Sequence, residues 1–167
     1  MNQKVKDAVI ASFIADALSL GVHWVYDTAQ IRDRYGRLEE MTAPELAPYH
    51  QSKNSGEFTH YGDQAMVLLE SVADRNRFDP VHFLSAWQKM NDGYTGYVDS
   101  ATKETLKNLA ADPNMDPPGS MSSDLGGAAR IAPLALVYSE DPDGFSKAAM
   151  TQAALTHNQA VVLESAA

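Results

Sequence analysis

Three aspartates in this sequence stand where a carboxylate could act on a ligand. Asp16 follows Val9 by seven residues and Phe13 by three, so it falls on the apolar face of its expected helix. An ionised carboxylate there is costly unless it is paired or hydrogen-bonded. Asp63 and Asp99 each stand at the expected start of a helix, where an aspartate can cap the helix or hold a ligand. Each of the three therefore has both a structural and a chemical role open to it.

A second set of residues could bind an anion. Gly126 and Gly127 let the backbone approach a ligand closely at the start of an expected helix, and a helix N-terminus attracts phosphate. Arg130 follows on the same helix and could bind a diphosphate. The interpretation that we favour pairs it with Asp16 or Asp99, because arginine readily makes bidentate contacts with carboxylates.

Two histidines, His23 and His157, could each contact a ligand or serve only the structure, and the sequence does not decide between these roles. His23 could donate a hydrogen bond to a ligand-binding residue, or it could be a surface or interhelical residue beside Trp24. His157 could hydrogen-bond a ligand, or it could only help to order a turn that Asn158 caps.

The elements that must position these residues are helices. Apolar residues recur at three- and four-residue spacing, and Asp-Pro pairs at 79–80 and 141–142 are typical helix starts. Strand signals are nearly missing. Residues 37–62 carry few periodic positions, and an irregular stretch of this length tends to be functional. We expect Asp63 to cap the helix that follows it and Asn158 to cap the last helix. The expected helices cover residues 5–20, 28–35, 63–73, 80–92, 100–111, 125–138, 142–155 and the chain from 160 onward.

Composition excludes several classes of function. Cysteine is absent, which excludes disulfides and thiolate chemistry. The net charge is −9 with no cluster of Lys or Arg, which argues against a nucleic-acid partner. No apolar run reaches the length of about 20 residues that a membrane span needs, and we expect a cytoplasmic protein. The 167 residues fit one helical domain. The last apolar helix lacks a stop signal, so we expect a C-terminal part or a second chain to complete the fold.

Four segments in a fixed order carry a family resemblance. They are Ala11–Leu18 (ASFIADAL), Thr59–Gln64 (THYGDQ), Asp124–Pro133 (DLGGAARIAP) and Ala154–Asn158 (ALTHN). Together they resemble the ADP-ribosylglycohydrolase family, and particularly its branch related to the J-type lens crystallins of jellyfish. The resemblance implies a compact orthogonal bundle of many helices, of which residues 1–167 would form the N-terminal part.

The resemblance also implies a function. It suggests a hydrolase that cleaves an N- or O-glycosidic bond to ADP-ribose or a related nucleotide sugar, with a small-molecule or ADP-ribosylated substrate. Asp99 resembles the cleft aspartate that would act as general base, where a carboxylate can activate water and stabilise an oxocarbenium-like ring. The residues expected to bind the substrate are Asp16, His23, Gly126, Gly127, Arg130 and His157.

The resemblance further implies a magnesium site, which this sequence carries in altered form. A family run of Thr-Asp-Asp-Thr supplies oxygen ligands to magnesium and corresponds here to residues 61–64, where only Asp63 is retained. Thr59 could help to complete the site. The loss of the run favours the alternative function, a non-catalytic family member that is either a ligand-binding or a crystallin-like structural protein.

Overall fold

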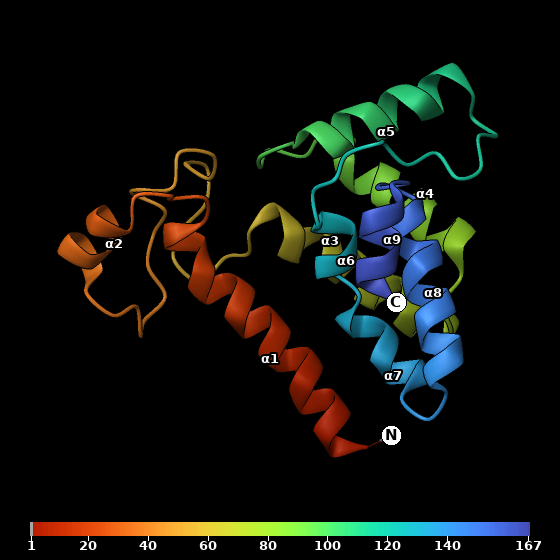
Figure 1. The fold of residues 1–167 in the computed structure, drawn as a ribbon, viewed down its shortest axis with the longest axis horizontal. Coiled ribbons are helices and arrows are strands. Elements are labelled where there is room, and N and C mark those ends of the chain that lie inside the picture. The colour runs from red at the N-terminus through yellow and green to blue at the C-terminus, as the bar shows by residue number, and fades with distance from the viewer. Residues whose placement is uncertain (1) are drawn as a thin grey trace.

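The computed structural model describes residues 2–167, and the regular secondary structure of this part of the chain consists of helices joined by irregular segments (Figure 1). Its only bridge between extended segments is an isolated one that joins Ser120 to His157. The all-α fold class predicted from the sequence is confirmed. The elements are α1 (Gln3–Ser19), the 3-10 helix η1 (Leu20–Val22), α2 (Thr28–Tyr35), α3 (His60–Arg75), α4 (Pro80–Asn91), α5 (Ser100–Ala111), α6 (Gly126–Ala129), the 3-10 helix η2 (Ala132–Leu134), α7 (Ala135–Tyr138), α8 (Pro142–Ala154) and α9 (Ala160–Ala166).

Aspartate caps begin four of these helices. The side chains of Asp27, Asp79, Asp99 and Asp141 each accept a hydrogen bond from a backbone amide in the first turn of α2, α4, α5 and α8. These bonds satisfy amides that have no partner within the helix. Proline occupies the first helical position of α4 and α8, as the Asp-Pro pairs predict.

Two predicted helix caps are wrong. Helix α3 begins three residues earlier than expected, because the Thr59 hydroxyl accepts from the Tyr61 amide at 3.1 Å and caps the helix. Asp63 therefore lies inside the first turn and is not the cap. The cap of α9 is Gln159, whose side chain accepts from the Val161 amide, rather than Asn158.

The helix expected over residues 125–138 is also divided. It forms α6, η2 and α7, and Pro133 lies within the 3-10 segment between the two short α-helices. Proline has no amide hydrogen to continue the α-helical bonding pattern, which accounts for the interruption.

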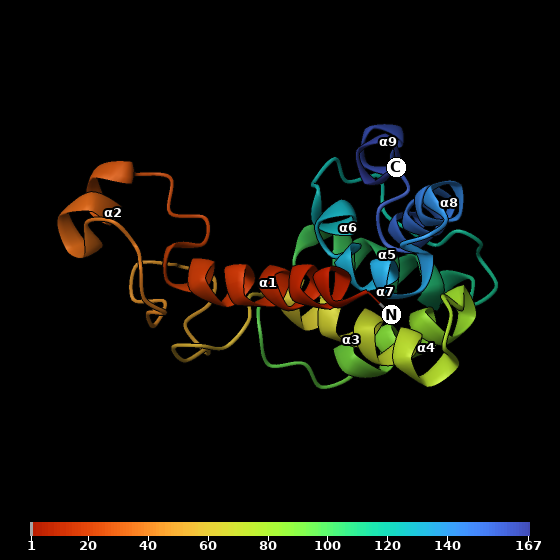
Figure 2. The same cartoon turned by 90° about the horizontal axis from the view of Figure 1, so that it is seen from below.

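The core lies between two helix pairs. Helix α3 packs against α4 and α8 packs against α9, and the fully buried side chains between them include Leu68, Phe83, Trp87 and Leu134. Helix α1 lies across this bundle and contacts α3, η2 and α7 (Figures 1 and 2). This arrangement holds the first turn of α3 at the centre of the molecule.

Helix α2 projects from the far end of α1, away from the other helices (Figures 1 and 2). None of its eight residues is buried. The long irregular segment that follows returns to the bundle, where Ala47 and His50 are both fully buried. Within residues 2–167, every helix falls short of the length and apolar character that a membrane crossing requires.

Candidate functional site

The first turn of α3 binds the carboxylate of Asp16. The backbone amide of Thr59 donates to Asp16 Oδ2 at 2.8 Å, and the Thr59 hydroxyl donates to Oδ1 at 2.7 Å. Burial raises the pKa of Asp16, and the two hydrogen bonds from Thr59 partly offset this rise. Asp16 thus meets the structural expectation for an acid on an apolar face, since a backbone amide satisfies it.

Asp63 lies on the same turn but faces other partners. Its Oδ2 lies 2.6 Å from Lys53 Nζ and also accepts a hydrogen bond from the Tyr94 hydroxyl. Both members of the Lys53–Asp63 pair are largely withdrawn from solvent. Lys53 therefore neutralises Asp63 within the protein.

The three aspartates singled out in the sequence converge on one region. Burial raises the pKa of Tyr94 above its ordinary value, and so do its hydrogen bond to Asp63 and the negative charges of Asp63, Asp16 and Asp99. The negative charges of all three carboxylates therefore act on the Tyr94 phenol. These acids come from α1, α3 and the start of α5, which lie far apart in the chain.

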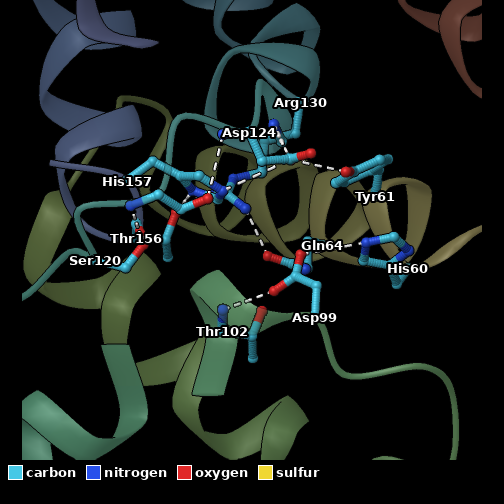
Figure 3. A network of polar contacts seen from close by, with 12 residues as sticks. His60, Tyr61, Gln64, Asp99, Thr102, Ser120, Asp124, Arg130, Thr156 and His157 are labelled. Carbon is cyan, nitrogen blue, oxygen red and sulfur yellow. Dashed lines mark hydrogen bonds and ion pairs between the residues drawn. The ribbon is translucent and has the colours of Figure 1, made fainter. Parts of the chain in front are cut away.

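Asp99 combines a structural and an electrostatic role. Its Oδ1 accepts from the Thr102 amide at 2.6 Å and caps α5, while its Oδ2 lies 3.2 Å from His60 Nε2 (Figure 3). The side chain is buried, with 6% of the residue exposed. Burial raises the pKa of Asp99, but contacts with His60 and Thr102 outweigh it and hold the pKa well below its ordinary value. Asp99 is therefore an anion at neutral pH.

A second carboxylate, that of Asp124, lines the same pocket. Asp99 and Asp124 both line a pocket with Trp24 and Tyr97. Asp124 Oδ1 accepts from the Tyr61 hydroxyl at 2.7 Å and, unlike Asp99, this side chain is substantially exposed.

A neighbouring pocket is lined by other residues that were predicted to bind the substrate. Asp16, His23 and Arg130 line it together with Tyr61. Because Tyr61 lines this pocket and its hydroxyl bonds to Asp124, its side chain lies between the two pockets. Asp63 and Thr59 line neither pocket.

Gly126 and Gly127 pack closely against neighbouring side chains. A Cβ atom on Gly126 would stand 2.5 Å from the Tyr61 ring, and one on Gly127 would stand 3.1 Å from His157 Cβ. The Gly126 amide donates to Asp124 Oδ1 at 2.8 Å. The two glycines thus permit close packing, and the first amide of α6 is already bonded within the protein.

Arg130 does not pair with Asp16 or Asp99, so the favoured sequence interpretation is wrong. Arg130 is 1% exposed, and its guanidinium donates to Gln64 Oε1 at 2.5 Å and to the Thr156 hydroxyl (Figure 3). Burial lowers the pKa of Arg130 to about 10, which still leaves it charged at neutral pH. No local sequence pattern indicates that Gln64 lies within reach of this group.

His157 lies beside this network. Its Nδ1 is 2.9 Å from the Thr156 hydroxyl, and its Nε2 is 3.9 Å from Asp124 Oδ1. Burial and the charge of Arg130 lower the pKa of His157 to about 4, so the ring is neutral at pH 7. His157 thus helps to order a polar turn and faces Asp124, and a hydrogen bond from this ring to a ligand stays a prediction.

Histidines 23, 50 and 60 form a cluster. One ring nitrogen from each lies within 4.8 Å of those from the other two, a spacing that could hold a metal ion. His23 is half-buried, while His50 and His60 are 0% and 1% exposed. His50 was not predicted from the sequence, because it stands alone in an irregular segment where no periodicity indicates burial.

Comparison with known proteins decides the family. The family model for ADP-ribosylglycohydrolase matches residues 1–167. The chain belongs to the ADP-ribosylglycohydrolase family. A solved structure described as an ADP-ribosylglycohydrolase-related protein complex superposes with a TM-score of 0.71 at 25% identity, over 98% of this chain and 53% of that one.

Other ADP-ribosylglycohydrolase relatives are jellyfish and archaeal proteins. Crystallin J1A of Tripedalia cystophora is 29% identical over 63% of this chain and 33% of its own length. An uncharacterized protein of Archaeoglobus fulgidus is 29% identical over 94% of this chain and 50% of its own length. The chain thus spans half or less of the length of these relatives.

Magnesium fits this chain's residues poorly. Gly62 offers no side chain, Lys53 neutralises Asp63, and both oxygens of Asp16 accept from Thr59. Magnesium prefers several oxygen ligands, usually with carboxylates among them. Within residues 2–167, the group of acidic and histidine side chains close enough to share an ion is the histidine cluster, whose nitrogens suit other metals.

Proposed function

We propose that residues 1–167 form the N-terminal part of a hydrolase that cleaves an N- or O-glycosidic bond to ADP-ribose or a related nucleotide sugar. The observation that carries this proposal is the buried, ionised carboxylate of Asp99 in one pocket with Asp124. Glycoside hydrolases usually use a pair of carboxyl groups as their catalytic groups. Family membership supplies the substrate class.

Asp99 would act chiefly through its negative charge. As the bond between the anomeric carbon and the leaving group breaks, the ribose ring gains positive charge, which a nearby carboxylate stabilises. Water then bonds to the anomeric carbon and gives up a proton, while the leaving group gains one. The depressed pKa of Asp99 makes it a weak base, so charge stabilisation and the orientation of the water would be its main contributions.

The remaining predicted residues would line or support the substrate. Asp16 and His23 lie in the pocket next to Asp99, and Gly127 packs against His157 beside Asp124. Arg130 is too enclosed to reach out freely, so we propose that its charge stabilises a diphosphate from within the pocket wall. Because the residues here fit magnesium poorly, we propose a hydrolase with altered metal dependence.

The test is release of free ADP-ribose from ADP-ribosylated arginine. It uses the complete natural polypeptide that contains this chain, with magnesium and with a chelator, because the curated relatives are about twice as long or longer. The Asp99→Asn variant should lose about 100-fold or more in rate, while Asp141→Asn, at an exposed helix cap, should stay active. Absence of release under both conditions would exclude the hydrolase.

A second function is favoured by specific observations. Gly62 replaces a metal-ligand position, Asp63 is neutralised, and two Tripedalia relatives are crystallins. These features favour a non-catalytic protein that binds a ligand or has a structural role. Calorimetric titration with ADP-ribose separates the cases: binding without turnover supports a ligand-binding protein, and neither binding nor turnover supports a crystallin-like one.

A further inference from the structure

The cluster of His23, His50 and His60 brings together three distant parts of the chain. His23 follows η1 at the end of α1, His50 lies in the long irregular segment, and His60 is the first residue of α3. Their ring centroids are 5.0 to 5.8 Å apart. Trp24 stands 4.9 Å from His23 and 5.2 Å from His60, so the rings are enclosed by aromatic side chains.

The ring nitrogens of this cluster are buried without hydrogen-bond partners. Both nitrogens of His50, both of His60 and Nε2 of His23 make no hydrogen bond in the described part of the chain. These are five of the eight buried side-chain nitrogen and oxygen atoms left in that condition among residues 2–167. Buried polar atoms without a partner are costly, and their concentration in one place points to a ligand.

Two members of the cluster, His23 and His50, are in the neutral form that binds metals. Burial and the positive charge of neighbouring groups lower the pKa of His23 to about 4 and that of His50 to about 3. Neutral imidazole has a free lone pair, so protons do not compete with a metal at pH 7. Lys53 is the cation that faces His50, and its salt bridge to Asp63 offsets that charge.

We propose that His23, His50 and His60 form a binding site for a divalent transition-metal ion, with zinc as the preferred ion and an open fourth position. Imidazole nitrogen suits zinc, copper and nickel, whereas magnesium prefers oxygen. Three protein ligands and one open position are typical of zinc sites that bind water or substrate. His23 also lines the pocket shared with Asp16, which provides an entry path.

His60 connects this site to Asp99. Its Nε2 lies 3.2 Å from Asp99 Oδ2, although the ring N–H is not aligned for a well-formed hydrogen bond. With Nε2 facing the carboxylate, Nδ1 is left to bind the ion. A carboxylate behind a metal-bound histidine commonly fixes the ring and makes it a better ligand.

Binding requires the rings to move. Zinc–nitrogen bonds of 2.0–2.1 Å place tetrahedral ligand atoms about 3.4 Å apart, and the nitrogens here are separated by up to 4.8 Å. His50 and His60 are also nearly parallel, with 26° between their planes. Because His50 lies in an irregular segment, its ring can turn without displacing a helix.

The site is tested with untagged protein that has been stripped with a chelator and dialysed at pH 7.5. Titration with cobalt(II) should give the visible absorption of a tetrahedral nitrogen site, and zinc should displace cobalt at one equivalent. Excess magnesium should displace neither. This readout does not depend on catalysis, so it stays informative if the proposed hydrolase activity fails.

Variants identify the ligands. His23→Gln, at the half-buried member of the cluster, should weaken cobalt binding at least tenfold, and Asp99→Asn should weaken it less. His82→Gln is the matched control, because His82 bonds to Ser71 outside the cluster. If His50→Gln fails to fold by circular dichroism, His23→Gln decides alone. Substoichiometric binding, displacement by magnesium, or equal affinity in the His23 and His82 variants would overturn the proposal.

Discussion

Asp99 Oδ2 and His60 Nε2 lie 3.2 Å apart, where the capping residue of α5 meets the first residue of α3. The starts of two helices thus face each other through a carboxylate and an imidazole. Amides at a helix N-terminus carry partial positive charge, which favours an anion between them. The same arrangement keeps Asp99 ionised and holds it in the pocket with Asp124.

The two roles of Asp99 can be separated by substitution. Asparagine caps a helix about as well as aspartate, whereas alanine does not, so Asp99→Ala should cost about 1 kcal/mol more in unfolding free energy than Asp99→Asn. Urea denaturation of both variants measures the difference. The Asp141→Ala and Asp141→Asn pair at the start of α8 provides the control. Equal stability of the two Asp99 variants would contradict a capping contribution.

Gln64 should be essential for accommodating the buried charge of Arg130. Its Oε1 accepts both from Arg130 at 2.5 Å and from the Trp87 indole at 2.8 Å. Gln64→Leu keeps the size but leaves both donors unpaired, so it should destabilise the fold by about 3 kcal/mol. Gln64→Glu retains an acceptor beside a cation and should cost less than about 1 kcal/mol at pH 7. Similar losses in the two variants, measured by urea denaturation, would refute this account.

Stability should fall with acidification because of His157. The pKa of its ring is lowered to about 4 in the folded protein from an ordinary value of 6.5, so the unfolded chain takes up the proton more readily. The contribution is complete above about pH 6.5 and is lost as the pH falls towards 4, by roughly 2–3 kcal/mol. Urea denaturation at several pH values should show a shallower decline in His157→Asn. An unchanged slope in that variant would assign the effect to other groups.

Gly62 should not tolerate even one methyl group. Replacing glycine by alanine in a helix usually stabilises it by about 0.4–1 kcal/mol, but a Cβ here would stand 2.2 Å from Asp16 Oδ2. Gly62→Ala should therefore destabilise the protein by about 1–3 kcal/mol. The penalty should shrink when Asp16 is also replaced by alanine, as a double-mutant cycle measures. A stabilised Gly62→Ala protein would disprove the close approach.

Much of the fold was predictable because its signals are local. The caps at Asp27, Asp79, Asp99 and Asp141 are within a few residues of the amides that they bind, so the sequence displays both partners. The start of α3 was misplaced because its cap, Thr59, is also held by Asp16, 43 residues away. A contact of that kind leaves no local pattern.

The candidate site was predictable in part for the same reason. Family resemblance brought Asp16 and Asp99 to attention, and the structure places them in two neighbouring pockets. The partners of Arg130 could not be inferred, because an arginine in a sequence shows no preference for a particular amide or hydroxyl over a carboxylate. The burial of His50 was not predicted, because it depends on how an irregular segment of the chain returns to the helical bundle.

Helix α2 has a consequence for the dynamics of the chain. An eight-residue helix without a buried side chain depends on its Asp27 cap, its glycine terminus at Gly36 and the exposed Arg34–Glu45 contact. Isolated helices of this length are marginal in water. Its amide hydrogens should therefore exchange with deuterium through frequent local opening, whereas those around Leu68 in α3 should exchange only when the whole bundle unfolds.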